Sequence, residues 1–109
     1  MQVRVSGKQI EIGGALPERV RTRIEAAIGK YFDGGAEAAI VFSREGAFYR
    51  SACTVHLDSG VVLKVEGQGT DAYRAFDVAL DLVGKRLRRY TRRLKSHHEK
   101  GRAPKGALS

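Results

Sequence analysis

The apolar and polar positions of the chain change their period from one segment to the next, and each period predicts an element. Residues 2–6 alternate, as a short strand does. Residues 15–32 carry apolar residues at helical spacing, with Pro17 in the first turn, where its missing N–H is harmless. The expected apolar face of this helix is Leu16, Val20, Ile24, Ala27, Ile28 and Tyr31. The segment Asp33-Gly34-Gly35 ends the helix.

Three further segments have the character of strands. Residues 36–45 are apolar at nearly every position, which indicates either burial on both faces or a central place in a sheet. Apolar and polar residues alternate in residues 48–59 and 61–68, which predicts strands with one buried and one solvent-exposed face. The turns at Glu45-Gly46 and Asp58-Ser59-Gly60 are short enough for hairpins, so we expect an antiparallel meander.

The last quarter of the chain predicts one long helix. It starts at the N-cap candidate Thr70-Asp71 and runs to about Ser96, which is roughly 40 Å. Its apolar positions are spaced alternately by 3 and 4 residues and form one continuous stripe. The stripe consists of Tyr73, Phe76, Leu80, Val83, Leu87, Tyr90 and Leu94. We expect these residues to hold the helix rigidly against the body of the domain.

The order of elements is therefore β-α-β-β-β-α. The first two strands are joined by a helix, so we expect them to be parallel with a right-handed crossover. The predicted fold class is α+β, a two-layer sandwich in which two helices cover one face of a four-stranded mixed sheet. We expect the domain to span residues 1–96, with residues 97–109 forming a flexible basic tail or the start of a linker.

Composition excludes several classes of protein. The 109 residues are 42% hydrophobic and 29% charged, which is typical of one globular domain. The chain has neither the apolar run of a membrane span nor the pattern of a signal peptide. Its single cysteine, Cys53, cannot form an internal disulfide and suits a reducing cytoplasm. We therefore expect a cytoplasmic protein, monomeric as an isolated domain.

Charge is distributed very unevenly. Residues 1–83 hold ten Lys/Arg and eleven Asp/Glu, whereas residues 84–109 hold ten Lys/Arg and one Asp/Glu. The net charge of +8 thus comes entirely from the last quarter of the chain. Such a basic block beside a neutral body favours a polyanion partner. An acidic membrane or protein surface, or a merely solubilising tail, would also be compatible with the charge alone.

Helical geometry puts the cations of the last helix opposite its apolar stripe. They are Lys85, Arg86, Arg88, Arg89, Arg92, Arg93 and Lys95. An ordinary exposed face mixes both signs, whereas this one has no acidic residue between Asp81 and Glu99. We therefore predict that this face contacts nucleic acid. Arg19, Arg23 and Lys30 share a strip on the first helix and would widen this surface if they face the last helix.

Other candidate sites are poor. His97-His98-Glu99 has adjacent histidines that would point in different directions, and Cys53 lies on the inward face of its strand. The glycines of residues 60–71 do not have the spacing of a phosphate-binding loop. No set of nucleophile, base and orienting residue stands out. We expect no metal, no cofactor, no small-molecule substrate and no enzymatic activity.

The segment from Glu66 to Lys95 resembles the ribosome hibernation-promoting factor family, also called ribosome-associated inhibitors or sigma-54 modulation proteins. A strand with a Glu-Gly turn leads into the motif D-x-Y-x-A-x-D, which is matched here by Asp71, Tyr73, Ala75 and Asp77. A helix with leucines and basic residues follows. Gly7, Ile10, Ile12 and the Lys30–Phe32 segment also fit, so the resemblance covers about residues 1–96. The departures are Ala72, Phe76 and Gly13-Gly14, which affect packing and capping.

The resemblance implies a domain that binds the small ribosomal subunit through ribosomal RNA. It would occupy the mRNA channel and the A- and P-site tRNA positions, inhibiting translation under stress or in stationary phase. Long members carry a second domain that pairs ribosomes, so this chain is either a short form or the N-terminal domain of a longer protein. Two alternatives are a general double-stranded RNA- or DNA-binding module without a ribosome role, and a module that docks on an acidic protein.

Overall fold

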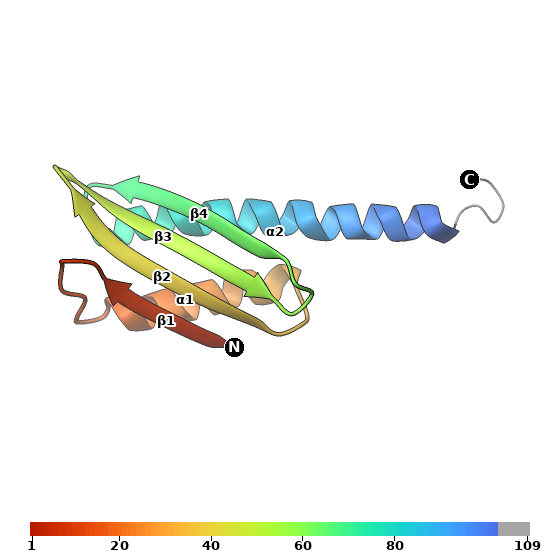
Figure 1. Cartoon of the computed structure of the whole chain (residues 1–109), viewed down its shortest axis with the longest axis horizontal. Coiled ribbons are helices and arrows are strands. Elements are labelled where there is room, and N and C mark those ends of the chain that lie inside the picture. Colours follow the sequence, from red (N-terminus) through yellow and green to blue (C-terminus); the bar gives the residue numbers. More distant parts are fainter. Residues whose placement is uncertain (103–109) are drawn as a thin grey trace.

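The computed structural model describes the backbone of residues 1–102 and the side chains of residues 1–93. The elements are β1 (Gln2–Gly7), α1 (Leu16–Tyr31), β2 (Ala36–Glu45), β3 (Phe48–Leu57), β4 (Val62–Gly69) and α2 (Ala72–Arg102). Both helices lie on the same side of the sheet, and α2 extends well past its end (Figure 1). The predicted α+β class and the β-α-β-β-β-α order are confirmed.

The sheet has the strand order β1-β2-β3-β4. β1 pairs with β2 in parallel, because α1 carries the chain back between them, and the other two pairs are antiparallel. Gly46 and Gly60 have φ of 59° and 97° in the two hairpin turns, a backbone conformation that glycine adopts without strain. The predicted mixed sheet and both turn positions are confirmed.

Strand β2 corrects one of the two interpretations of its apolar run. It is central in the sheet, as one interpretation required, but it is not buried on both faces. Ala38, Ile40 and Phe42 face the core, whereas Val41 on the other face is 37% exposed. The reason is that both helices cover the same face of the sheet, so nothing within residues 1–93 covers the other one.

The core lies between that covered face and the two helices. Val20, Ile24 and Ile28 of α1 are at most 1% exposed, as are Phe76, Val83 and Leu87 of α2. The rings of Phe42 and Phe76 meet at a tilt with centroids 6.5 Å apart, which joins β2 to α2. The predicted apolar face of α1 is confirmed, with Ala27 and Tyr31 half-buried at its margin.

The apolar stripe of α2 differs from the prediction at its start. Tyr73 is 39% exposed and is not part of the core, whereas Ala75 and Ala79 are fully buried. The cause is the close approach of α2 to β4, where a Cβ on Gly67 would collide with the carbonyl oxygen of Ala75 and lie 2.5 Å from the nitrogen of Ala79. Only small residues fit on this face of the helix.

Helix α2 is also longer than predicted, because it ends at Arg102 and not near Ser96. The chain contains neither glycine nor proline from Lys85 to Lys100, so nothing interrupts the helical backbone there. The side chain of Leu94, the last residue of the predicted stripe, lies outside the described residues. Of the predicted tail of residues 97–109, residues 97–102 belong to this helix, and residues 103–109 are not described.

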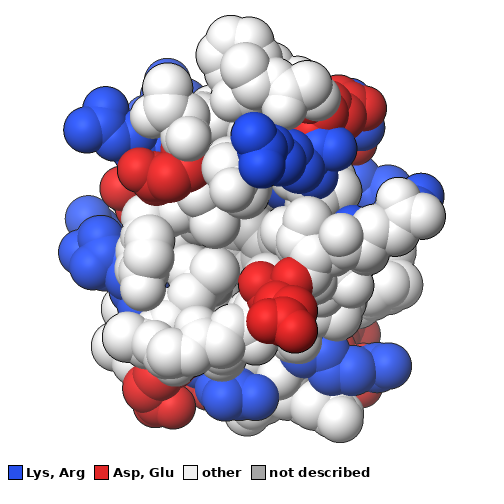
Figure 2. Space-filling model, turned by 90° about the vertical axis from the view of Figure 1, so that its left-hand side faces the viewer, with Lys and Arg blue, Asp and Glu red and all other residues white. Residues whose placement is uncertain are grey.

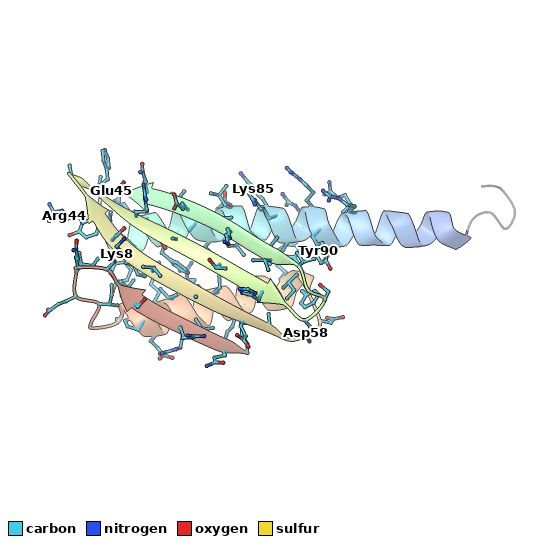
Figure 3. All side chains as sticks on the ribbon, in the orientation of Figure 1. Lys8, Arg44, Glu45, Asp58, Lys85 and Tyr90 are labelled. Carbon is cyan, nitrogen blue, oxygen red and sulfur yellow. The ribbon has the colours of Figure 1, made fainter. Side chains whose placement is uncertain are left out.

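Tyr90 connects α2 to the body of the domain near the point where the helix leaves the sheet. Its hydroxyl and Ser59 Oγ are hydrogen-bonded at 2.8 Å, and its ring packs at a tilt against Phe32, 6.5 Å between centroids. Figure 3 shows Tyr90 near Asp58 of the β3–β4 turn, at this end of the sheet. The helix is thereby fixed between the end of α1 and the β3–β4 turn before it continues alone.

Neither helix, within residues 1–102, combines the length and the apolar character that a membrane crossing requires.

Candidate nucleic-acid interface

The cations of α2 lie on a helix without interruption. The segment from Gly84 to Arg93 is helical throughout, and its six described basic side chains are all exposed. These are Lys85, Arg86, Arg88, Arg89, Arg92 and Arg93. The buried face of the same segment is Leu87, with Tyr90 half-buried at the edge. The side chain of Lys95, the seventh predicted cation, lies outside the described residues.

These six cations cover a broad arc of the helix surface, here called the α2 arc. One side of the arc faces α1 and the other faces β4. Lys85 and Arg88 line a groove shared with α1, where Arg23 and Lys30 face them. Arg86 lies on the opposite flank, in a hollow that it shares with Lys64 of β4. Helical spacing places Arg92 on the side of Arg88, and Arg89 and Arg93 on the side of Arg86. The structure thus brings Arg23 and Lys30 next to the cations of α2, which is the condition under which the strip on the first helix would widen the surface.

The groove between α1 and α2 has a volume of about 640 Å³. Its floor is small and apolar, with Ala26 and Ala27 of α1 facing Leu80 and Gly84 of α2. Its rims are charged. They carry the four cations Arg23, Lys30, Lys85 and Arg88 and the two carboxylates Asp77 and Asp81. With more cations than carboxylates on its rims, the groove attracts an anionic chain electrostatically.

Few of these cations have an acidic partner. Lys85 Nζ lies 3.3 Å from Asp81 Oδ2, an exposed pair one turn apart. Within residues 1–93, the other groove cations form no ion pair, and the same is true of Arg86, Arg89, Arg92 and Arg93. Lys30 Nζ lies 5.5 Å from the centroid of the Tyr31 ring. Most of the positive charge is therefore available to an external partner.

Arg19 has a different environment from the other predicted cations. Its guanidinium lies 5.4 Å over the ring of Tyr73, and its Nη2 is 3.9 Å from Asp77 Oδ1. The Nε atom is buried and has no hydrogen-bond partner among residues 1–93. These contacts hold the start of α2 against α1. The structure thus assigns Arg19 a contact between the helices, in addition to any role in binding.

The four motif residues all organise the start of α2. Asp71 Oδ1 accepts a hydrogen bond of 2.8 Å from the backbone N–H of Arg74, which is the expected N-cap. Ala75 packs against the glycines of β4, and Tyr73 and Asp77 hold Arg19. Sequence reasoning predicted the cap at Asp71 but missed the roles of Tyr73, Ala75 and Asp77. The available signal was a pairing of small residues, because β4 has two glycines two positions apart and α2 has two alanines one turn apart.

The end of the sheet that lies away from Tyr90 carries side chains of both charges. Figure 3 shows Lys8, Arg44 and Glu45 there, far from Lys85 along the sheet. Arg50 Nη2 is bonded to Glu45 Oε1 at 2.7 Å. Figure 2 faces this end and shows basic and acidic side chains interspersed around an uncharged surface. An excess of positive charge is therefore found on α2 and on the surfaces beside it, and not at this end of the sheet.

Cys53 is a core residue, as predicted. It is 1% exposed, and its burial raises the pKa of the thiol to about 11, with a small opposing effect of the Ser51 hydroxyl. Among the described side chains, no group of three or more His, Cys, Asp or Glu could hold a metal ion. The side chains of His97, His98 and Glu99 lie outside the described residues.

We expect Cys53 to resist alkylation in the native protein at pH 8. The thiolate is the reactive form, and with a pKa of about 11 only about one thiol in a thousand is ionised at that pH. Iodoacetamide should label the protein in denaturing urea and leave it almost unlabelled in buffer, as followed by mass spectrometry. Equal labelling rates in the two conditions would show that the thiol is accessible in the folded state.

Known proteins are similar to this chain over most of its length. Residues 3–95 match the family described as Sigma 54 modulation protein / S30EA ribosomal protein. A ribosome hibernation promotion factor of Rhizobium meliloti (strain 1021) is 47% identical over 98 residues, which are 90% of this chain and 52% of that protein. A ribosome hibernation promoting factor of Escherichia coli (strain K12) is 30% identical over 97 residues, covering 89% of this chain and 100% of that protein.

A solved structure has the same fold. The N-terminal domain of Protein Y from Thermus thermophilus superposes with a TM-score of 0.74 at 28% identity, covering 83% of this chain and 99% of that one. The chain spans about half the length of the Rhizobium and Bradyrhizobium relatives it matches. The matching family is described as a modulation protein and ribosomal protein, in line with the prediction of a chain that is not an enzyme. By its sequence, its element order and its sheet topology, the chain belongs to the Sigma 54 modulation protein / S30EA ribosomal protein family.

Proposed function

We propose that this chain acts in ribosome hibernation by binding the small ribosomal subunit through ribosomal RNA. It would fill the mRNA channel and the A- and P-site tRNA positions, and translation would stop because the substrates cannot enter. The observation that carries this proposal is the arc of exposed cations on α2. Five of its arginines have no carboxylate partner within residues 1–93, in a chain whose relatives are named ribosome hibernation factors.

The chemistry of the arc suits an RNA backbone. A guanidinium can donate two parallel hydrogen bonds to one phosphate, and contacts to phosphates position a protein without reading base sequence. Folded RNA is recognised mostly by its shape and backbone. A rigid helix is the appropriate partner, because it holds its arginines at fixed separations. The core contacts of Leu87 and the tether at Tyr90 supply that rigidity.

The like charges of α2 also favour binding. Arg88 and Arg92 are one turn apart, as are Arg89 and Arg93, and such pairs destabilise an isolated helix by a few tenths of a kcal/mol each. A polyanion that neutralises these arginines removes this repulsion. Ribosome association would place the protein in the cytoplasm. Pairing of ribosomes would require a further domain of the kind that long members of the family carry.

Competition between small subunits and naked RNA tests the proposal. If about six phosphates are engaged, log K for the subunit should fall with log[salt] with a slope of about −4 to −5. An unlabelled small subunit should displace the protein from fluorescent duplex RNA far better than the same mass of duplex does. Equal competition would instead indicate a general nucleic-acid-binding module. A partner that stays bound after nuclease treatment of a pull-down would indicate an acidic protein.

Two substitutions on α1 separate binding residues from packing residues. Lys30→Gln removes an exposed groove cation, so the magnitude of the salt slope should fall by about 1 while the fold is unchanged. Arg19→Gln removes the contact with Tyr73 and Asp77. It should lower the free energy of unfolding by up to about 1 kcal/mol and leave the slope unchanged. Urea denaturation and salt titration measure the two effects, and a slope reduced by both variants alike would contradict the distinction.

A further inference from the structure

The rim of the groove between α1 and α2 carries only cations at one end, and one cation with two carboxylates at the other. The helices are parallel, because Arg19 meets Asp77 near their starts and Phe32 meets Tyr90 near the end of α1. Equal helical rise then puts Arg23 level with Asp81, and Lys30 level with Arg88. The half of the groove near the starts of both helices, here called the starting half, therefore has two carboxylates on its rim. The far half has only cations, which are Lys30 and Arg88 with Lys85 next to them.

Stability does not explain the carboxylate of Asp81. Its only ion pair within residues 1–93 is with Lys85, and the two side chains are 67% and 59% exposed, so the pair contributes little to folding. The helix dipole favours acidic residues only within the first turn, and Asp81 lies in the third turn of α2. A negative charge on the rim of a groove for polyanions weakens their attraction, and the exposed pair with Lys85 compensates little of this cost.

We propose that Asp81, supported by Asp77, is a specificity-determining residue that excludes phosphates from the starting half of the groove. This inference rests on the proposed function, because it concerns which RNA the same surface accepts. A phosphate at the level of Arg23 faces both carboxylates and is repelled, whereas one at the level of Lys30 and Arg88 meets only cations. The phosphate chain is thereby held in one position along the groove.

The physical advantage is discrimination. A cationic surface by itself binds any nucleic acid, because attraction to phosphate carries no sequence information. Specific binders add repulsive elements that penalise the wrong partner more than the right one. RNA of fixed shape, as in a ribosomal subunit, can leave the starting half empty. A naked duplex that lies along the groove in any register places phosphates against Asp81 in many of its positions.

The test is Asp81→Asn, which keeps the shape of the side chain and removes its charge. Its dissociation constants for purified small subunits and for a naked duplex RNA are compared with those of the natural sequence. We expect duplex binding to tighten by about threefold to tenfold, with subunit binding changed by less than twofold. The matched control is Glu25→Gln, which gives the same change in net charge on the exposed flank of α1 away from the groove. It should leave the ratio of the two constants unchanged.

Asp81→Asn removes the repulsion of phosphate and also releases Lys85 from its ion pair. A double-mutant cycle separates these two effects. The tightening caused by Asp81→Asn should persist in a Lys85→Gln background if the carboxylate acts on the phosphate directly. The inference is overturned if the tightening disappears in that background, or if Asp81→Asn and Glu25→Gln shift the ratio equally. A failure of the proposed function would give another result. The unsubstituted protein would then bind small subunits no more tightly than duplex RNA.

Discussion

Replacing Arg89, Arg92 and Arg93 together with glutamine is expected to abolish stable association with the small subunit. All three side chains are exposed, and none has an acidic partner within residues 1–93, so their loss removes phosphate contacts without breaking the fold. Each charge-assisted hydrogen bond to phosphate contributes about 1.5–3 kcal/mol. Three such losses should weaken binding by at least about a hundredfold and reduce the magnitude of the salt slope by about 3.

Co-sedimentation with small subunits through a sucrose cushion measures this effect. The control variant replaces Arg4, Lys8 and Arg44 with glutamine, which removes the same charge from exposed positions on β1, on the loop after it and on β2. Figure 3 shows Lys8 and Arg44 at the end of the sheet away from Tyr90. The control should sediment with subunits as the natural sequence does. If both variants were lost from the pellet equally, net charge alone would explain the binding, and the α2 arc would not.

Gly67→Ala is expected to be the most damaging single substitution for the fold. An added Cβ would collide with the carbonyl oxygen of Ala75 and approach the nitrogen of Ala79 to 2.5 Å. Both are backbone atoms of α2, so no side-chain rotation relieves the overlap and the whole helix must move away from β4. Overpacking of this kind typically costs 1–3 kcal/mol, and we expect a loss of about 3 kcal/mol in the free energy of unfolding.

Gly29→Ala is the matched control, because it makes the same chemical change on α1 where a Cβ would meet nothing within 4 Å. Alanine is the better helix former, so this variant should gain about 0.5–1 kcal/mol. Urea unfolding followed by circular dichroism measures both variants. Similar stability changes of the same sign in the two variants would show that α2 does not approach β4 as closely as described.

The displacement of α2 in Gly67→Ala should also reach the binding surface. Lys85 and Arg88 face Arg23 and Lys30 only while α2 keeps its position on the sheet beside α1. The fraction of Gly67→Ala that remains folded should therefore bind small subunits more weakly than the natural sequence. This links an uncharged residue of β4, remote from any phosphate, to the geometry of the proposed interface.

Tyr73 illustrates where sequence reasoning failed. The spacing of 3 and 4 residues assigned it to the apolar stripe, and the same spacing was correct for Phe76, Val83 and Leu87. Periodicity specifies the relative angle of residues on one helix but not the centre of the face that the rest of the protein covers. The approach of α2 to Gly67 shifts that centre toward Ala75 and Ala79, and Tyr73 is left to pack under Arg19.

The sequence alone determined the order of the elements, the parallel first pair of strands and the cationic character of the last helix. These properties follow from local periods, turn residues and counted charges, which need no knowledge of distant contacts. Only the tertiary structure decided that Arg19 joins the helices, that Lys30 and Arg88 share one groove, and that two carboxylates lie on its rim. Those facts depend on contacts between residues about sixty positions apart, and the packing of α2 against the glycines of β4 sets them.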